Sequence, residues 1–276
     1  MAQPSRRRGG GLMVRRTVRA TVTAALLLLA GLSVAGAAER FDGAIEGAHL
    51  LDTLALDGAL DHVQGVEIAG RWLWVTSVDR AARRGYLDAF DRVTGQWLRR
   101  VELTDGARYH PGGLSRSGGS LWVAVAELRP HSSAVLVELD AATLRVRRRL
   151  HVADHLGCVA ASGRRLVAGN WDSRALYLID LDDLAHVRIV PNPSSTRYQD
   201  MKFVGDQLVA GGNLDPWSGT VDWLDWPSMT LRRTLRAGAV GPLRAYTGEG
   251  MTIAGRDLYV LPEDGPSRLF HFRLES

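Results

Sequence analysis

Five apolar stretches recur along the chain, and each follows a short segment that ends in glycine. The apolar stretches are 72–75, 120–123, 165–168, 207–210 and 257–260. The segments before them align without gaps at 64–70, 112–118, 157–163, 199–205 and 249–255, and their final glycines are 42 to 50 residues apart. A repeat of this length is typical of propeller blades, in which each copy forms one small sheet. We therefore expect five copies of one structural unit.

Each copy contains the pattern of four strands. A strand, a glycine turn and a second strand are followed by a polar loop and a third apolar stretch, such as 134–139. An Asp-x-x-Thr turn, as at 91–94 and 140–143, leads to a fourth stretch in which arginine alternates with Leu or Val, as at 144–150. Alternation with a period of two indicates a strand with one exposed face. Four strands in about 45 residues indicate one blade of a β-propeller.

The two ends of the repeat array complement each other. The last repeat stops after its third strand at 267–274, while residues 49–56 precede the first repeat as a strand without a partner. Pairing these segments would close the ring and remove exposed sheet edges. The sequence predicts an all-β fold, a single five-bladed β-propeller over residues 38–276 whose N-terminal strand completes the last blade.

Residues 1–37 have the pattern of a secretory signal peptide. This stretch contains six arginines and no acidic residue, an uncharged segment covers 20–38, and the small residues at 35–37 fit a cleavage site. We expect an exported protein, periplasmic or secreted, without a stable membrane anchor after cleavage. An uncleaved anchor is the alternative, because 19 uncharged residues can just span a bilayer. The sequence leaves open whether translation starts at Met1 or at Met13, and whether export follows the Sec or the Tat route.

The net charge indicates which kind of partner to expect, and the cysteine count indicates whether a disulfide can form. The chain carries a net charge of +4, but six of its arginines lie in 1–37, so the remainder is slightly acidic. The basic surface of a nucleic-acid-binding protein is therefore not expected. A single cysteine, Cys158, excludes an internal disulfide, and we interpret it as a small buried side chain. We expect a monomer whose partner is a small polar or anionic molecule.

Polar residues recur where the first strand of each repeat begins. His62, His110, His155 and Arg197 each lie two residues before their repeat. First strands line the central channel of a propeller, so these equivalent positions should meet at one mouth, where pockets commonly form. Three imidazoles and a carboxylate suit Zn²⁺, whereas a set of Asn, Asp and Glu would suit Ca²⁺. The metal-ligand candidates are His62, His110, His155 and Glu249.

Histidines in this position can also form hydrogen bonds within their own blade, so a polar pocket without a metal stays an alternative. The catalytic candidates are His110, Glu127 and His155. The ligand-binding candidates are Gln64, Arg129, Asn170, Asp172, Arg174, Arg197, Gln199, Asp200, Lys202, Asn213 and Glu263. A polar pocket of this kind is the standard starting hypothesis for a binding or active site.

Segments 108–115, 121–130, 153–157 and 198–202 resemble the bacterial and fungal family called domain of unknown function 6454, DUF6454. The H-P-G-G and A-E-x-R-P motifs within them are the most specific parts. The resemblance implies a propeller, and it implies site roles for His110, Glu127, Arg129, His155, Trp171, Ser173, Arg174, Gln199, Asp200 and Lys202. It implies no reaction. Asp172 departs from the W-G-S-R run of the family, which leaves the role of this residue open.

A looser likeness is to the lactonase and gluconolactonase-type propellers, which hold a divalent ion with Glu, Asn and Asp. Three functions follow as hypotheses. The first is a metal-dependent hydrolase of a lactone, ester or phosphoester. The second is a non-catalytic propeller that binds a ligand or a protein. The third is a carbohydrate-active enzyme with paired carboxylates, Glu127 with Glu263 or Asp172, which requires a separation of about 5 to 10 Å.

Overall fold

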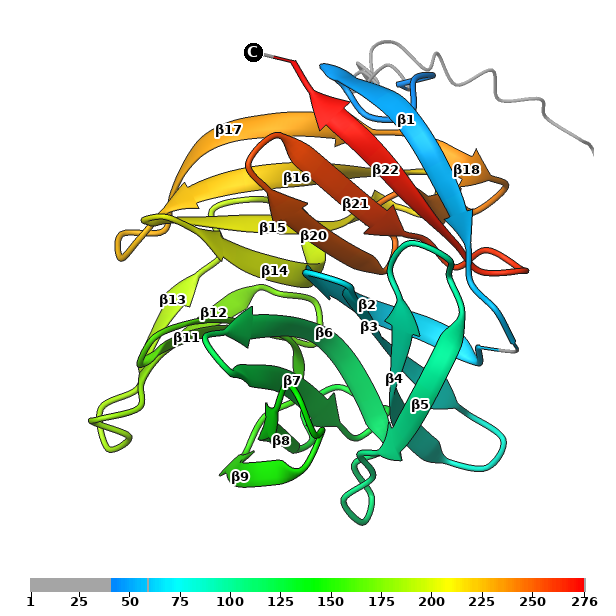
Figure 1. Ribbon diagram of the computed structural model, residues 1–276. Helices are drawn as coiled ribbons and strands as arrows, with labels where there is room; N and C mark the ends of the chain where they lie inside the picture. Colours follow the sequence, from blue (N-terminus) through cyan, green and yellow to red (C-terminus); the bar gives the residue numbers. More distant parts are fainter. Residues whose placement is uncertain (1–40, 59, 276) are drawn as a thin grey trace, which may run out of the picture. The chain divides into compact units, whose positions relative to one another are not determined.

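The computed structural model describes residues 41–58 and 60–275, and this part of the chain is built from strands without an α-helix. Five four-stranded antiparallel sheets are arranged around a common axis as a five-bladed β-propeller (Figure 1). The predicted fold class is confirmed. The predicted signal peptide at 1–37 lies outside the described residues. Within these residues, no helix of a length and hydropathy able to span a membrane is found.

Four blades are continuous in sequence. Blade 1 consists of β2 (His62–Ala69), β3 (Trp72–Asp79), β4 (Arg84–Asp91) and β5 (Trp97–Glu102). Blade 2 consists of β6 (His110–Ser117), β7 (Ser120–Ala126), β8 (Ala134–Asp140) and β9 (Val146–Val152). Blade 3 consists of β10 (Leu156–Ser162), β11 (Arg165–Asn170), β12 (Ala175–Asp180) and β13 (Arg188–Pro191). Blade 4 consists of β14 (Arg197–Val204), β15 (Gln207–Asp215), β16 (Ser218–Asp225) and β17 (Thr230–Ala237).

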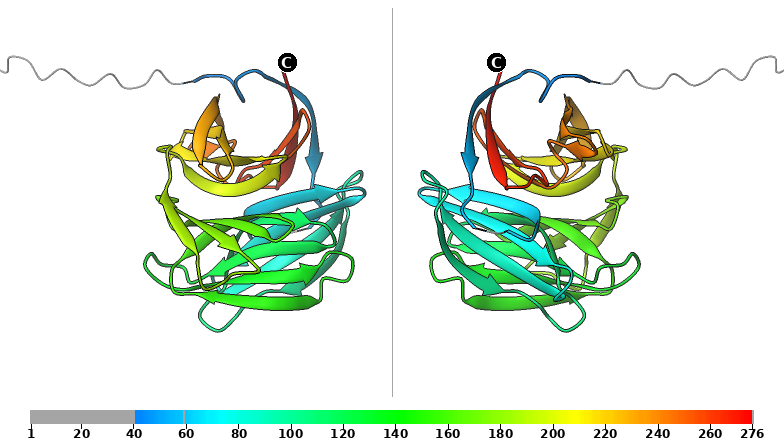
Figure 2. Two further views of the ribbon diagram at one scale, coloured as in Figure 1. Left: turned by 90° about the vertical axis from the view of Figure 1, so that its left-hand side faces the viewer. Right: turned by 90° about the vertical axis from the view of Figure 1, so that its right-hand side faces the viewer.

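Blade 5 is formed by both ends of the described chain. It consists of β20 (Gly250–Ala254), β21 (Asp257–Leu261), β22 (Arg268–Leu274) and β1 (Ala48–Ala55). The N-terminal β1 pairs antiparallel with β22, and in Figures 1 and 2 the blue strand lies beside the red one. The predicted ring closure is thus confirmed. A short ribbon that the repeat pattern did not predict, β18 (Ala239–Gly241) with β19 (Arg244–Ala245), connects blades 4 and 5.

The repeated turns explain why the sequence folds into these hairpins. Each glycine that closes a repeat segment has a positive φ of 57 to 62°, a conformation that glycine adopts without steric cost. Between the third and fourth strands, Asp91 and Asp140 accept hydrogen bonds from backbone amides two and three residues further on. An aspartate that bonds to the following backbone in this way stabilises a tight turn.

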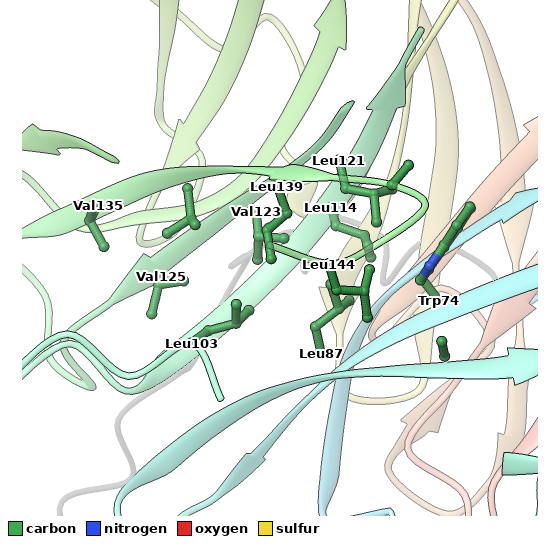
Figure 3. Packing of buried hydrophobic residues seen from close by; sticks show 13 residues of the cluster. Trp74, Leu87, Leu103, Leu114, Leu121, Val123, Val125, Val135, Leu139 and Leu144 are labelled. Atoms are coloured by element: carbon green, nitrogen blue, oxygen red, sulfur yellow. The ribbon is translucent and has the colours of Figure 1, made fainter. Parts of the chain in front are cut away.

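Hydrophobic side chains fill the space between neighbouring blades. One cluster, shown in Figure 3, joins blades 1 and 2 through Trp74 and Leu87 on one side and Leu114, Val123 and Leu139 on the other. These side chains are fully or almost fully buried. Burial of a large apolar side chain stabilises a fold by about 1.5 to 3 kcal/mol, so the seams hold the blades in a fixed orientation.

The inner strands β2, β6, β10, β14 and β20 contact one another in sequence around the axis. Four of them have a register shift near their N-terminal end, for example between Val63 and Val66 in β2 and between Tyr198 and Asp200 in β14. A bulge bends a strand and redirects the side chains beside it. The mouth of the channel, where these strands begin, is therefore lined by the residues that precede and open each inner strand.

Candidate functional site

A cavity of about 630 Å³ opens at the mouth of the channel. His62, His110 and His155 line it together, as the repeat positions predicted, and Gln64 and Glu249 lie beside them. His62 and His110 open β2 and β6, whereas His155 directly precedes β10. The three histidines therefore come from three consecutive blades and converge because the blades are related around one axis.

His155 is held in one tautomer. Its Nδ1 lies 2.8 Å from the carbonyl oxygen of Glu127 and 3.2 Å from that of Arg129. A carbonyl oxygen can only accept, so Nδ1 carries the hydrogen and Nε2 of the neutral ring keeps its lone pair. Burial lowers the pKa of His155, opposed by these two hydrogen bonds. The ring is accordingly neutral near pH 7, with a basic nitrogen fixed in orientation.

His110 lies next to it in a more buried environment. The ring centroids of His110 and His155 are 6.2 Å apart, and Nδ1 of His110 is buried without a hydrogen-bond partner among the described residues. Burial lowers the pKa of His110 to about 3, and the neighbouring charges of His155, His62 and Arg80 add to this. The rings of His155 and Trp171 pack in a T-shaped arrangement at a centroid distance of 4.5 Å.

Glu249 is a buried carboxyl group in the same cavity. Its side chain is 14% exposed, and its Oε2 accepts a hydrogen bond of 3.1 Å from Gln64 Nε2. Burial raises the pKa of Glu249 well above its ordinary value, an effect that the charge of Glu263 increases and that of Arg80 opposes. Burial disfavours an ionised carboxylate unless a cation or several donors compensate it.

His62 connects Glu249 with Glu263. The Nε2 of His62 lies 3.7 Å from Glu249 Oε1, and its Nδ1 lies 2.6 Å from Glu263 Oε1. The second contact is the largest cause of the lowered pKa of Glu263. The three side chains place one potential ligand atom each within 4.8 Å of one another. Of the predicted metal ligands, His62 and Glu249 join this group, whereas His110 and His155 do not.

Three arginines line the cavity: Arg80, Arg174 and Arg197. The guanidinium of Arg174 donates to the carbonyl oxygens of Ser194 and Ser195, at 3.4 and 2.7 Å, and lies 3.6 Å from Asp172. These contacts fix its orientation. Among the described residues, two acidic side chains, Asp172 and Glu249, line the cavity with them. Because the guanidinium groups outnumber the acidic side chains, the cavity favours an anionic ligand.

The cavity contains most of the predicted ligand-binding residues. Those that line it are Gln64, Asp172, Arg174, Arg197, Gln199 and Asn213. Glu263 lines a neighbouring cavity of about 500 Å³ that shares His62 with the first. Asn170 instead accepts a hydrogen bond from the amide of Ala175 and stabilises its own hairpin.

Glu127 and Arg129 do not line the cavity with their side chains. The carboxylate of Glu127 accepts hydrogen bonds from Ser133 Oγ and Arg129 Nε, at 2.7 and 3.0 Å, and the Ser133 bond is the larger cause of its lowered pKa. Both residues act on the site through their backbone carbonyls, which orient His155.

Asp200 and Lys202 are buried at the centre of the ring, away from the cavity lining. Asp200 accepts hydrogen bonds from the amides of Val66 in blade 1 and Met251 in blade 5, and its Oδ1 lies 2.6 Å from Lys202 Nζ. Lys202 also donates to the carbonyl of Leu114 in blade 2. This ion pair connects four blades, and these contacts are to the backbone of the neighbouring blades.

Arg80, Leu128, Trp171 and Tyr198 also line the cavity. Trp171 belongs to the motif that the DUF6454 resemblance carried over, but the other three were not among the candidates. Arg80 directly follows Asp79, the last residue of β3. Its position next to a strand end was the one sequence observation that could have identified it as a cavity residue.

Comparisons with known proteins give one family and a fold. The model of the "Family of unknown function (DUF6454)" matches residues 62–260. A comparison with curated proteins finds no match. Among solved structures, the Myxococcus xanthus glutaminyl cyclase is similar with a TM-score of 0.63 and 13% identity, over 84% of this chain and 99% of that one.

A luciferin-regenerating enzyme is similar with a TM-score of 0.49 and 11% identity, over 80% of this chain and 79% of that one. The Dos1 propeller has a TM-score of 0.42 and 14% identity, over 73% of this chain and 50% of that one. At these identities, the similarity to the glutaminyl cyclase establishes a shared propeller fold, and function has to be argued from the site.

Proposed function

The chain belongs to DUF6454, a family of unknown function, and we propose from its site that the channel-mouth cavity binds a small anionic molecule and hydrolyses it. The observation that carries the proposal is the state of His155. A neutral imidazole with a fixed tautomer and a free Nε2 is the arrangement that a general base requires. The lowered pKa of His155 keeps this nitrogen unprotonated near neutral pH, so it is available to accept a proton.

The proposed reaction uses His155 to activate water. Nε2 accepts a proton from a water molecule as its oxygen attacks a carbonyl carbon or a phosphorus atom. The protonated ring then returns that proton to the leaving oxygen, so the base is regenerated. Because Nδ1 stays bonded to two carbonyl oxygens throughout, the ring does not have to reorient between these steps.

Arg174 and Arg197 are proposed to bind the anionic group of the substrate. A guanidinium pairs with a carboxylate or phosphate through two parallel hydrogen bonds, and Arg174 is already oriented by its backbone contacts. Trp171, 43% exposed, offers an apolar face beside His155. A substrate with an anionic end and a short apolar or planar part fits this combination.

The experiment is a hydrolysis screen with lactones, carboxylic esters and phosphoesters, run with and without divalent ions. An N-terminal glutaminyl peptide is added because a glutaminyl cyclase shares the fold. His155→Gln should reduce kcat by about 100-fold or more, the usual contribution of a general base. His186→Gln, an exposed histidine paired with Asp183, is the matched control and should retain full activity.

Two results would contradict the hydrolase. Activity that His155→Gln leaves unchanged would exclude this residue as the base. A silent panel, combined with tight binding of one of its anions, would favour the non-catalytic propeller instead. The carbohydrate-active enzyme is less supported, because the carboxylates of Glu127 and Glu263 do not line the channel-mouth cavity.

A further inference from the structure

The group formed by His62, Glu249 and Glu263 lies on the boundary between two cavities. His62 lines both, Glu249 lines the channel-mouth cavity and Glu263 lines the neighbouring one. His62 begins blade 1, whereas Glu249 precedes β20 and Glu263 follows β21, so the last two belong to blade 5. The seam that closes the ring therefore brings one imidazole and two carboxylates together at a position reached from solvent on two sides.

The charges of this group are incompletely compensated. Two carboxyl groups share one imidazole, and among residues 41–58 and 60–275 the hydrogen-bond donor to Glu249 is the neutral amide of Gln64. Nδ1 of His62 is buried and faces Glu263 Oε1 at 2.6 Å, so this imidazole is engaged by Glu263 on one side and lies near Glu249 on the other. Arg80 acts on both carboxyl groups from the cavity wall. A buried carboxylate with so few donors is costly without a cation.

The spacing of the atoms is close to that of a metal site. Ligand atoms bonded to zinc at about 2.0 to 2.2 Å lie at most about 4.4 Å apart. His62 Nε2 and Glu249 Oε1 are 3.7 Å apart, and all three groups offer atoms within 4.8 Å. Glu263 faces Nδ1 of His62, so binding of an ion between Nε2 and Glu249 requires its carboxylate to move toward Nε2; its side chain is 57% exposed and therefore has room to do so.

We propose that His62, Glu249 and Glu263 bind a divalent cation of the zinc type. An imidazole with two carboxylates suits zinc and its first-row neighbours, whereas Ca²⁺ prefers oxygen ligands alone. Three protein ligands leave a coordination position open toward the cavity, which is the arrangement of catalytic rather than structural zinc sites. This ligand set keeps His62 and Glu249 of the four candidates expected from the repeat positions and adds Glu263.

This site deepens the proposed function, on which its catalytic meaning rests. An ion at this position would polarise the substrate oxygen or a water molecule near His155. Metal binding itself needs no substrate and is measured separately. Zinc binding without hydrolysis would support the metal site and contradict the proposed hydrolase. Hydrolysis by a protein that binds no zinc would support the hydrolase and contradict the metal site.

The test uses untagged purified protein, stripped with a chelator and titrated with zinc chloride alone by calorimetry. The protein should bind one equivalent at this site, and Glu249→Gln, a change of nearly equal shape, should weaken that binding at least tenfold. The control is Glu275→Gln, which alters an exposed glutamate that lies 3.0 Å from His49 and belongs to no three-ligand group. Its affinity should equal that of the unaltered protein.

Equal zinc affinity in Glu249→Gln and the unaltered protein would overturn the proposal, as would the absence of a bound equivalent. Circular dichroism establishes that each variant is folded. If Glu249→Gln does not fold, Glu263→Gln replaces it, because this side chain is exposed and its loss leaves no buried charge. Zinc binding unchanged in Glu263→Gln would likewise overturn the three-ligand site.

Discussion

Removal of the Asp200 carboxylate tests how the ring is held together. The carboxylate is completely buried and accepts hydrogen bonds from the amides of Val66, Met201 and Met251 and from Lys202 Nζ. In Asp200→Ala all four donors lose this acceptor. Lys202, 4% exposed, keeps only its bond to the carbonyl of Leu114 among the contacts described here.

Breaking a buried ion pair by removing one partner costs about 3 to 5 kcal/mol, because the remaining charge is left uncompensated. In a domain of this size, about 1 kcal/mol lowers the melting temperature by about 2 to 4 °C. We therefore expect Asp200→Ala to lower the melting temperature, measured by calorimetry, by about 6 to 20 °C. The free energy of unfolding, measured by urea denaturation, should fall by about 3 to 5 kcal/mol. The double variant Asp200→Ala/Lys202→Met should be more stable than Asp200→Ala alone, because it contains no unpaired ammonium.

The matched control is Asp182→Ala. Asp182 also pairs with a basic residue, Arg164 at 2.6 Å, but its side chain is 67% exposed. Exposed pairs contribute little because water solvates both charges in either state. Equal shifts in Asp200→Ala and Asp182→Ala, or a double variant that is less stable than Asp200→Ala, would refute the assignment of the buried pair as the tie between blades.

Three further predictions follow from buried groups. Burial lowers the pKa of His110 to about 3, so the unfolded chain takes up a proton near pH 6.5 whereas the folded protein does not. The free energy of unfolding should therefore fall as the pH drops from 6.5 toward 3, by up to about 1.4 kcal/mol per pH unit. His110→Gln should flatten this dependence when it is measured by urea denaturation at several pH values. Gly112→Ala should destabilise the fold in thermal melts, because its Cβ would overlap the carbonyl oxygen of Gly157, whereas Gly119→Ala meets no atom within 4 Å and should be tolerated. Burial raises the pKa of Cys158 to about 12, so a thiol reagent should label it in urea but not in the folded protein.

The repeats made the architecture predictable from sequence. Each copy contains its own turn residues and strand pattern, so the blade could be read locally, and the missing fourth strand at one end identified β1 as its replacement. The convergence of His62, His110 and His155 followed from the same symmetry, because equivalent residues of a ring meet around its axis.

The side-chain directions within the site could not be predicted in the same way. Gln199 lines the cavity, whereas the adjacent Asp200 is buried in the ring centre. The register shift between Tyr198 and Asp200 marks a bulge at Gln199. Side chains do not alternate regularly at a bulge, so the strand period does not predict which of these residues faces the cavity. Arg80 was missed since it lies beyond the end of β3, where the strand period no longer determines orientation.

The central claim is that residues from separate blades form one anion-binding site beside a basic imidazole. Its most direct test is a crystal structure of the purified protein with methylphosphonate, a stable tetrahedral anion. We predict the phosphonate in the channel-mouth cavity, bonded to Arg174 or Arg197 and within hydrogen-bond distance of His155 Nε2. A phosphonate bound only outside this cavity, or a His155 ring turned away from the carbonyls of Glu127 and Arg129, would contradict the account.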